Sequence, residues 1–167
     1  MPLRADEVDP SVPFTESERL FRRVSPNGFN AARELLPSEL NTFSFDKDID
    51  SAPSVMRSLF CDWIDVLSFD CSQRDVSDWQ VFYLNVQDLP SELPAGDGRG
   101  FTFFPVHRPL ALCGAHSVIS SAVLGDETRT YVAPPRPVRN ALRTKLATIL
   151  KPIEQSIGDL GSQELSL

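Results

Sequence analysis

Hydrophobic and polar positions follow a strand pattern most clearly in the middle of the chain. The segment Trp79–Val86, WQVFYLNV, is aromatic and β-branched, with polar residues only at Gln80 and Asn85. This pattern is typical of a central strand, because few of its positions suit water on either face. We expect further strands at Phe101–Val106, Ser117–Leu124, Thr42–Phe45, Val66–Phe69 and Thr130–Ala133.

Apolar positions with helical spacing occur toward both ends of the chain. The clearest stripe predicts a C-terminal helix, with Pro137 in its first turn and Pro152 near its end, through Val138, Leu142, Leu146, Ile149 and Ile153. Near the N-terminus, Thr15 followed by Glu18 is a capping pattern. It predicts a helix that ends at Ser25–Gly28 and carries Leu20, Phe21 and Val24. Shorter helices are expected over Ala31–Leu36 and Pro53–Ile64.

This order of elements indicates an α+β fold. We expect a mainly antiparallel sheet of about four to six strands, with N-terminal and C-terminal helices and the helices on one face of the sheet. The 167 residues suit a single domain. We expect a flexible arm over residues 1–13, one globular domain over residues 14–155 and a flexible tail over residues 156–167.

The charge of the chain is acidic overall but uneven. The net charge is −7, yet residues 136–151 hold five of the 16 basic residues and none of the 23 acidic ones, which leaves −12 for the rest. An acidic chain repels phosphate backbones, so we expect no nucleic-acid partner. We expect instead that another protein faces this helix, at Arg136, Arg139, Arg143 and Lys145.

The three cysteines, Cys61, Cys71 and Cys113, are an odd number without framework spacing. The N-terminus is polar, and the longest apolar stretches are far shorter than a membrane span. We therefore expect a cytoplasmic protein with free thiols and no membrane partner.

The segment Phe101–Val123 holds both histidines and one cysteine, which are groups that ligate, titrate or attack at neutral pH. The candidate functional residues are His107, Arg108, Cys113 and His116. A zinc site would need further ligands from Cys61, Asp70 or Cys71, and a thiolate–imidazolium pair would need Cys113 beside a histidine. An exposed His107–Arg108 pair suits anion recognition. Any such site requires the chain to turn between Pro109 and Gly114, and otherwise the segment is a packed strand.

Two other motifs fail their chemical requirements. Asp46, Asp48 and Asp50 resemble the start of a calcium loop, but its sixth position is Ser51 and its twelfth is Arg57. The GDGRG sequence of residues 96–100 lacks the Lys-Ser/Thr of a phosphate-binding loop, so we expect a hairpin turn there.

Three short motifs resemble a known group of proteins. LFRRVSP at 20–26, FSFDKD at 43–48 and FPVHRPLALCGAHSVI at 104–119 are similar to a loose group of small uncharacterised bacterial proteins. That group has a leading Leu-x-Arg-x-x-x-Pro, a central Ser-Phe-Asp or Ser-Val-Asp strand end and a late Ala-His-[Ala/Ser]-x-[Val/Ile]. The resemblance implies a bacterial accessory protein, encoded in a defence or toxin–antitoxin type of gene cluster, with His116 as the motif histidine.

The sequence favours a non-enzymatic protein-interaction or accessory module, with no cofactor and no metal. The alternative is a small metal-dependent or Cys/His hydrolase whose site surrounds His107, Cys113 and His116. No catalytic residue is assigned at this point.

Overall fold

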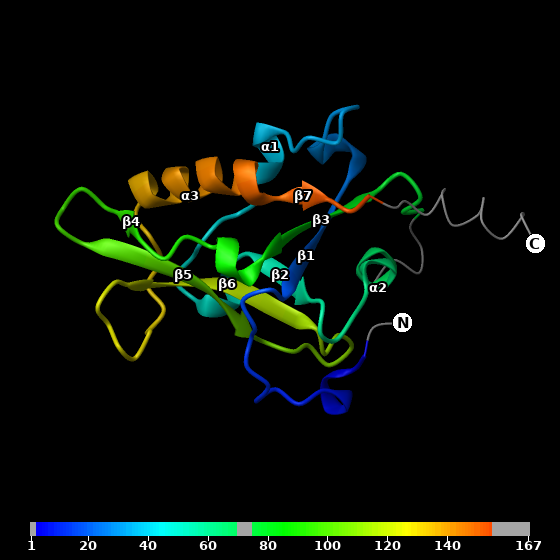
Figure 1. Ribbon diagram of the computed structural model, residues 1–167, viewed down its shortest axis with the longest axis horizontal. Coiled ribbons are helices and arrows are strands. Elements are labelled where there is room, and N and C mark those ends of the chain that lie inside the picture. Colours follow the sequence, from blue (N-terminus) through cyan, green and yellow to red (C-terminus); the bar gives the residue numbers. More distant parts are fainter. Residues whose placement is uncertain (1–2, 70–74, 155–167) are drawn as a thin grey trace, which may run out of the picture.

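A curled seven-stranded sheet organises the computed structural model, which describes residues 3–69 and 75–154 (Figure 1). Hydrogen-bonded neighbours run antiparallel in the order β4-β5-β6-β2-β1-β3-β7. In chain order the strands are β1 Arg19–Val24, β2 Ser54–Arg57, β3 Gln80–Asn85, β4 Leu93–Pro94, β5 Gly100–His107, β6 His116–Val123 and β7 Lys151–Pro152. The α+β prediction is therefore confirmed, with more strands than expected.

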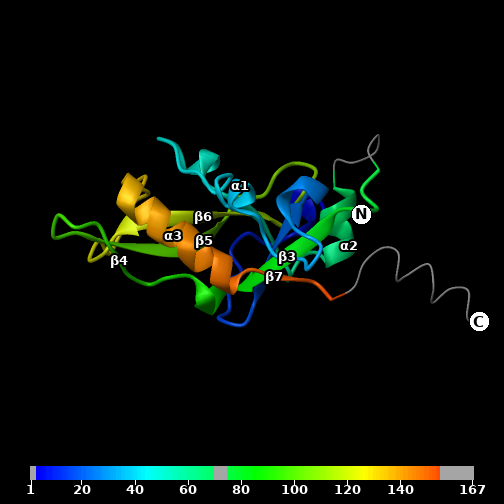
Figure 2. The same cartoon turned by 90° about the horizontal axis from the view of Figure 1, so that it is seen from above.

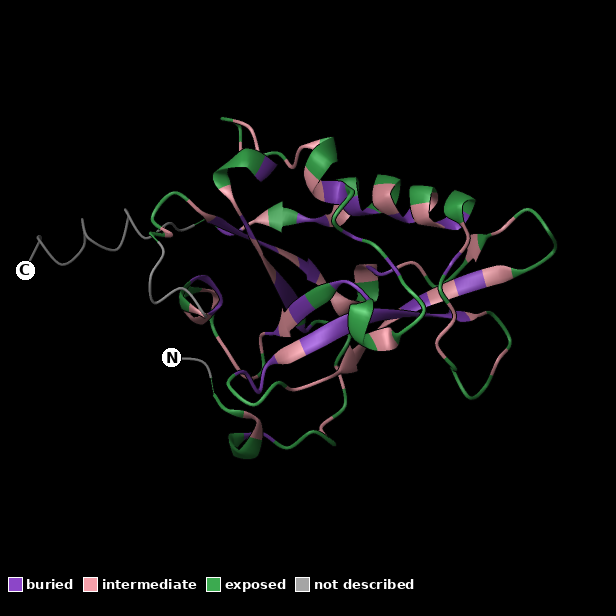
Figure 3. Cartoon of the chain, turned by 180° about the vertical axis from the view of Figure 1, so that it is seen from behind, coloured by how far each residue is buried: buried purple, intermediate pink, exposed green. Residues whose placement is uncertain are grey.

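Helices cover parts of both faces of the sheet. The α-helices are α1 Pro37–Leu40, α2 Trp63–Ser68 and α3 Arg136–Ile149, and short 3₁₀ turns lie at Ala5–Glu7, Pro26–Gly28, Ile49–Ser51 and Val86–Asp88. α3 crosses above the sheet (Figure 2) and buries Val138, Leu142 and Leu146 in the larger core. Figure 3 shows buried positions on the inner side of α3 and along the long strands, nearly continuous in β6 and alternating with half-buried positions in β5.

The residues of β1 show why the helices cannot lie on one face only. Leu20 and Val24 belong to the larger core beneath α3, whereas Phe21 belongs to a second core with Val66 and Leu67 of α2. Successive strand residues point to opposite faces, so α2 covers the other side of the sheet. The prediction that all helices share one face is wrong.

The predicted N-terminal helix is the strand β1. Its polar residues have partners that only a strand provides, because alternate side chains reach opposite faces. Arg22 bonds Ser54 and Thr42 on one side, whereas Arg23 donates to the carbonyls of Leu67 and Phe69 on the other. Glu18 does not complete a capping box, because its carboxylate pairs with Arg57.

The order of elements over residues 53–69 is the reverse of the prediction. Residues 54–57 form β2 between β1 and β6, and the helix follows as α2 where a strand was expected. The start of α2 is fixed by Asp62, whose carboxylate accepts from the amides of Ile64 and Asp65, while Asp65 returns a bond to the amide of Asp62. This is a reciprocal cap of the kind that defines helix starts.

Three short expected elements are absent from the described residues at their predicted positions. Residues 31–36 do not form a helix, because the Asn30 side chain accepts from Ala32 and Glu34 and closes a turn instead. Pro37 begins α1, as proline favours the first helical turn. Thr42–Phe45 and Thr130–Ala133 are not strands.

The longest patterns are confirmed. The predicted strands at Trp79–Val86, Phe101–Val106 and Ser117–Leu124 correspond to β3, β5 and β6. The C-terminal apolar stripe corresponds to α3 as far as Ile149, whereas Ile153 lies beyond β7 in the second core. Pro152 lies on the edge strand β7, where a missing amide donor costs no sheet bond. Residues 156–167 lie outside the described residues.

Residues 3–13, here called the N-terminal arm, pack on the domain rather than extending from it as a flexible segment. Val8 is buried, and Leu3 and Ala5 exchange backbone hydrogen bonds with Gly114 and Ala111. The arm therefore belongs to the globular unit, contrary to the domain boundary expected at residue 14.

Candidate functional site

The loop that joins β5 to β6, residues 108–115, turns back on itself within the predicted segment. Leu110 and Cys113 exchange two backbone hydrogen bonds, with N···O distances of 3.0 and 2.8 Å. At the base of the loop the amide of Arg108 donates to the carbonyl of His116 over 3.1 Å. The chain does turn between Pro109 and Gly114, as a site in this segment requires.

Both histidines hold this loop through their rings. Nε2 of His107 lies 2.6 Å from the carbonyl oxygen of Gly114, and Nδ1 of His116 lies 2.6 Å from that of Arg108. A carbonyl oxygen only accepts, so each of these ring nitrogens carries the donated hydrogen. In the neutral His116 ring, Nε2 then accepts from the hydroxyl of Ser54, 3.2 Å away.

The N-terminal arm closes over the other side of the loop. The amide of Gly114 donates to the carbonyl of Leu3 over 2.6 Å, and the amide of Ala5 donates to that of Ala111 over 3.4 Å. Gly114 is required at this point, because a Cβ there would lie 2.5 Å from the carbonyl oxygen of Arg4 and 2.7 Å from Val8. The arm and both histidines therefore fix one loop conformation.

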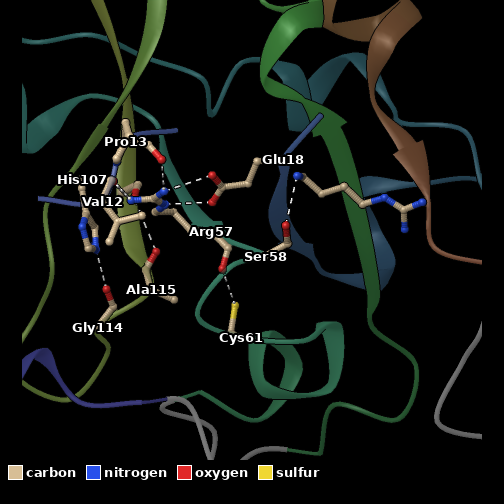
Figure 4. Close-up of polar contacts among 11 residues, drawn as sticks. Val12, Pro13, Glu18, Arg57, Ser58, Cys61, His107, Gly114 and Ala115 are labelled. Atoms are coloured by element: carbon tan, nitrogen blue, oxygen red, sulfur yellow. Dashed lines mark hydrogen bonds and ion pairs between the residues drawn. The ribbon is translucent and has the colours of Figure 1, made fainter. Parts of the chain in front are cut away.

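A buried arginine, Arg57 of β2, joins the arm to the sheet (Figure 4). Its Nε and Nη2 donate to the two carboxylate oxygens of Glu18 over 2.8 and 3.0 Å. Nη1 and Nη2 also donate to the carbonyls of Val12 and Pro13 over 2.9 and 3.1 Å. The backbone amide of Arg57 donates to Ala115 at the end of the loop. Four hydrogen bonds satisfy a charge that burial would otherwise make costly.

Aromatic rings complete this cluster and connect it to the loop. The guanidinium carbon of Arg57 lies 3.8 Å from the ring centre of Phe14 and 5.0 Å from that of Phe60. Phe60 in turn stacks on His107, with 5.4 Å between ring centres and 20° between planes. We call Arg57, Glu18, Phe14 and Phe60 the Arg57 cluster. It supports His107 through the stacked Phe60 ring.

The loop tip presents apolar side chains to solvent. Leu112 is 68% exposed and Leu110 is 46% exposed, and Leu3 on the arm, whose carbonyl accepts from Gly114 of the loop, is 40% exposed. Arg108 at the loop base pairs with Asp50, with 2.7 Å between Nε and Oδ1. Large apolar side chains that share one exposed locus are a mark of interaction surfaces.

The thiols lack the properties of nucleophiles. Cys113 is completely buried, and burial raises the pKa of its thiol. Burial likewise raises the pKa of Cys61, with Cys113, Asp65, Asp62 and Glu18 adding smaller effects in the same direction. The thiolate is the reactive form, so the raised pKa values lower the reactivity of both thiols at neutral pH. Cys71 and Asp70 lie outside the described residues.

The four candidate residues thus meet at one loop without forming a metal or thiol site. Three of the four ring nitrogens of His107 and His116 face backbone carbonyls or Ser54, and the fourth, Nδ1 of His107, is buried without a hydrogen-bond partner. Residues 3–69 and 75–154 contain no group of three or more His, Cys, Asp or Glu that could hold a metal ion. Arg108, a candidate anion ligand, is paired with Asp50, one of the residues of the failed calcium motif.

The basic residues of α3 divide between two sides of the helix. Arg136, Arg139 and Arg143 follow the spacing that places side chains on one face, and Arg143 donates to the carbonyl of Phe43. Lys145 follows Arg143 by two residues, which turns it to the other side. The four predicted partner-facing residues therefore do not form one surface.

The Arg57 cluster was missed by the sequence analysis. The one signal in the local sequence is that Arg57 follows an inward-facing apolar residue, Val55, by two positions in SVMR, residues 54–57, where another apolar residue would be expected. The partner Glu18 lies 39 residues earlier. Its proximity depends on the pairing of β1 with β2, which a single sequence does not specify.

Comparison with known proteins adds no assignment: no family model, no curated protein and no solved structure matches this chain. Among the described residues, no helix has the length and apolarity needed to cross a membrane.

Proposed function

We propose that this chain is a protein-interaction module that docks a partner protein on the tip of loop 108–115 together with the end of the N-terminal arm. The observation that carries the proposal is the exposure of Leu112 and Leu110 on a loop whose backbone is held from three directions, together with the exposure of Leu3 on the arm that holds it. We call these three residues the leucine tip.

A loop that is already ordered presents these side chains at a low entropic cost of binding. Ordering a loop on binding costs free energy that is subtracted from affinity, and a loop already held in one conformation avoids that cost. Two histidine bonds, the Leu110–Cys113 pair and the arm hold the loop without filling the space around Leu112. The partner surface that fits is an apolar pocket or groove able to receive leucine side chains.

The hydrolase alternative has less support. Its thiol is buried with a raised pKa, and its imidazoles hold backbone carbonyls. The same two histidines instead support the docking proposal, because they fix the loop from which the leucines project.

The proposal is tested by placing a photoreactive amino acid at position 112 and irradiating cells of the source organism. A matched control places the same group at Thr148, which is exposed on α3. We expect a discrete crosslinked protein from position 112 that is absent from position 148 and is lost when Leu110→Asp is added.

The crosslinked protein is then purified and its affinity for variants is measured. Burying a leucine contributes about 1.5–3 kcal/mol, so Leu112→Asp should weaken binding at least about tenfold. Leu124→Asp is the control, since Leu124 is 44% exposed but lies at the far end of β6. Equal losses for both variants, or a crosslink only to a second copy of this chain, would overturn the proposal.

A further inference from the structure

A hollow between the sheet and the start of α2 borders the second core, where Phe21 and Ile153 line it, and it is separate from the leucine tip. Its volume is about 830 Å³, within the range of small-molecule sites. One wall comes from the sheet, through β1, β3 and β7, and the other from the start of α2, where Trp63 lines it. None of its lining residues belongs to loop 108–115.

Three side chains from three adjacent strands form a row in this hollow. Tyr83 of β3 is the register partner of Lys151 of β7, and the guanidinium carbon of Arg19 of β1 lies 4.4 Å from the Tyr83 ring centre. All three line the hollow with Trp63. The Tyr83 ring, which lies between the cations Arg19 and Lys151, therefore lines the hollow together with the Trp63 indole.

The two cations have no acidic partner among the described residues. Within residues 3–69 and 75–154, no carboxylate lies within 4.0 Å of the charged nitrogens of Arg19 or Lys151, whereas ion pairs are formed there by Arg4, Arg22, Arg57, Arg99 and Arg108. Two acids do line the hollow. The Asp62 carboxylate is occupied by the amides at the start of α2, and Glu154 is exposed to solvent. Unpaired cations beside aromatic rings suit a ligand that has both a planar ring and an anionic group.

We propose that this hollow, here called the Arg19 site, binds a small aromatic anion of the nucleoside monophosphate class. The ring of the ligand stacks against Trp63, and its phosphate pairs with Lys151 and with Arg19, which the Tyr83 ring holds in place. Arginine and lysine both bind phosphate, and arginine offers paired donors in a fixed plane. The size of the hollow accommodates one such molecule rather than a polymer.

Three probe ligands separate recognition of the aromatic ring from recognition of the phosphate. Binding of AMP, adenosine and inorganic phosphate to the full chain is followed by amide chemical shifts. We expect AMP to bind more tightly than either adenosine or phosphate, with shifts centred on residues 19, 63, 83 and 151. Equal affinities for AMP and adenosine, or shifts confined to the other faces of the protein, would overturn the assignment.

Variants test the roles of the individual residues. The double variant R19M/K151M keeps the aliphatic stems and should weaken AMP at least tenfold while leaving adenosine unchanged. W63L should weaken both ligands. K145M on α3 is the matched charge control and should change neither. Retention of native amide spectra shows that each variant folds, so an unchanged AMP affinity in folded R19M/K151M would refute the site.

Discussion

The substitution Glu18→Gln isolates the charge of one member of the Arg57 cluster while keeping its size. Arg57 has no exposed surface and the Glu18 side chain is 5% exposed, so the pair is shielded from water. The variant leaves the guanidinium buried with its bonds to Val12 and Pro13 but without a counterion. Removing one partner of a buried ion pair costs about 3–5 kcal/mol of unfolding free energy.

Urea unfolding measures this loss. With an m-value of about 2 kcal/mol/M, a loss of that size lowers the unfolding midpoint by roughly 1.5–2.5 M. Glu16→Gln is the control, because Glu16 is exposed two residues away and its change should stay within about 0.5 kcal/mol. The double variant Glu18→Leu with Arg57→Met removes both charges and should be less destabilised than Glu18→Gln alone. A midpoint for Glu18→Gln within the error of Glu16→Gln would refute the reasoning.

Three further outcomes follow from the loop and its surroundings. Gly114→Ala should displace the arm and cost about 1–3 kcal/mol of unfolding free energy by overpacking. Limited trypsin digestion should then cut after Arg4 faster than in the unmodified chain, whereas Leu112→Ala should leave the cleavage rate unchanged. In a Cys71→Ser background, iodoacetamide at pH 8 should modify Cys61 and Cys113 far more slowly in the native protein than in urea, because burial raises the pKa of both thiols. Equal modification rates in the two conditions would contradict the burial of these thiols. Thiols in the unfolded chain lose their protons above about pH 8.5, whereas the native thiols keep theirs to higher pH. The free energy of unfolding should therefore fall as the pH rises past about 8.5. Urea titrations of Cys113→Ala should show a smaller slope of this fall.

The parts of the fold that the sequence predicts well are those with long, consistent patterns. The apolar stripe of α3 spans four turns, and β3 is apolar on both faces, so neither pattern fits another element. The residues of β1 are different, since Leu20, Phe21 and Val24 satisfy helical spacing and strand burial alike. Pairing with β2 and β3 decides between them, and that pairing is a tertiary effect that overrides local propensity.

In the candidate site, too, some features follow from the local sequence and others depend on tertiary contacts. His107, Cys113 and His116 do lie close together, because His107 ends β5, His116 begins β6 and Cys113 lies in the loop between them. Their chemistry was not predictable from spacing, because it depends on which carbonyl each ring meets across the turn. The Arg57 cluster and the Arg19 site combine residues that lie tens of positions apart, so only the register of the sheet brings them together.

The claim that loop 108–115 is held ready for a partner is tested most directly by amide hydrogen exchange in the free protein. The amides of Cys113 and Gly114, which donate to Leu110 and Leu3, should exchange as slowly as those in the middle of β6. The exposed amide of Leu112 should exchange quickly beside them. If Cys113 and Gly114 exchange as fast as Leu112, the loop is not held in one conformation and the basis for docking at the leucine tip is lost.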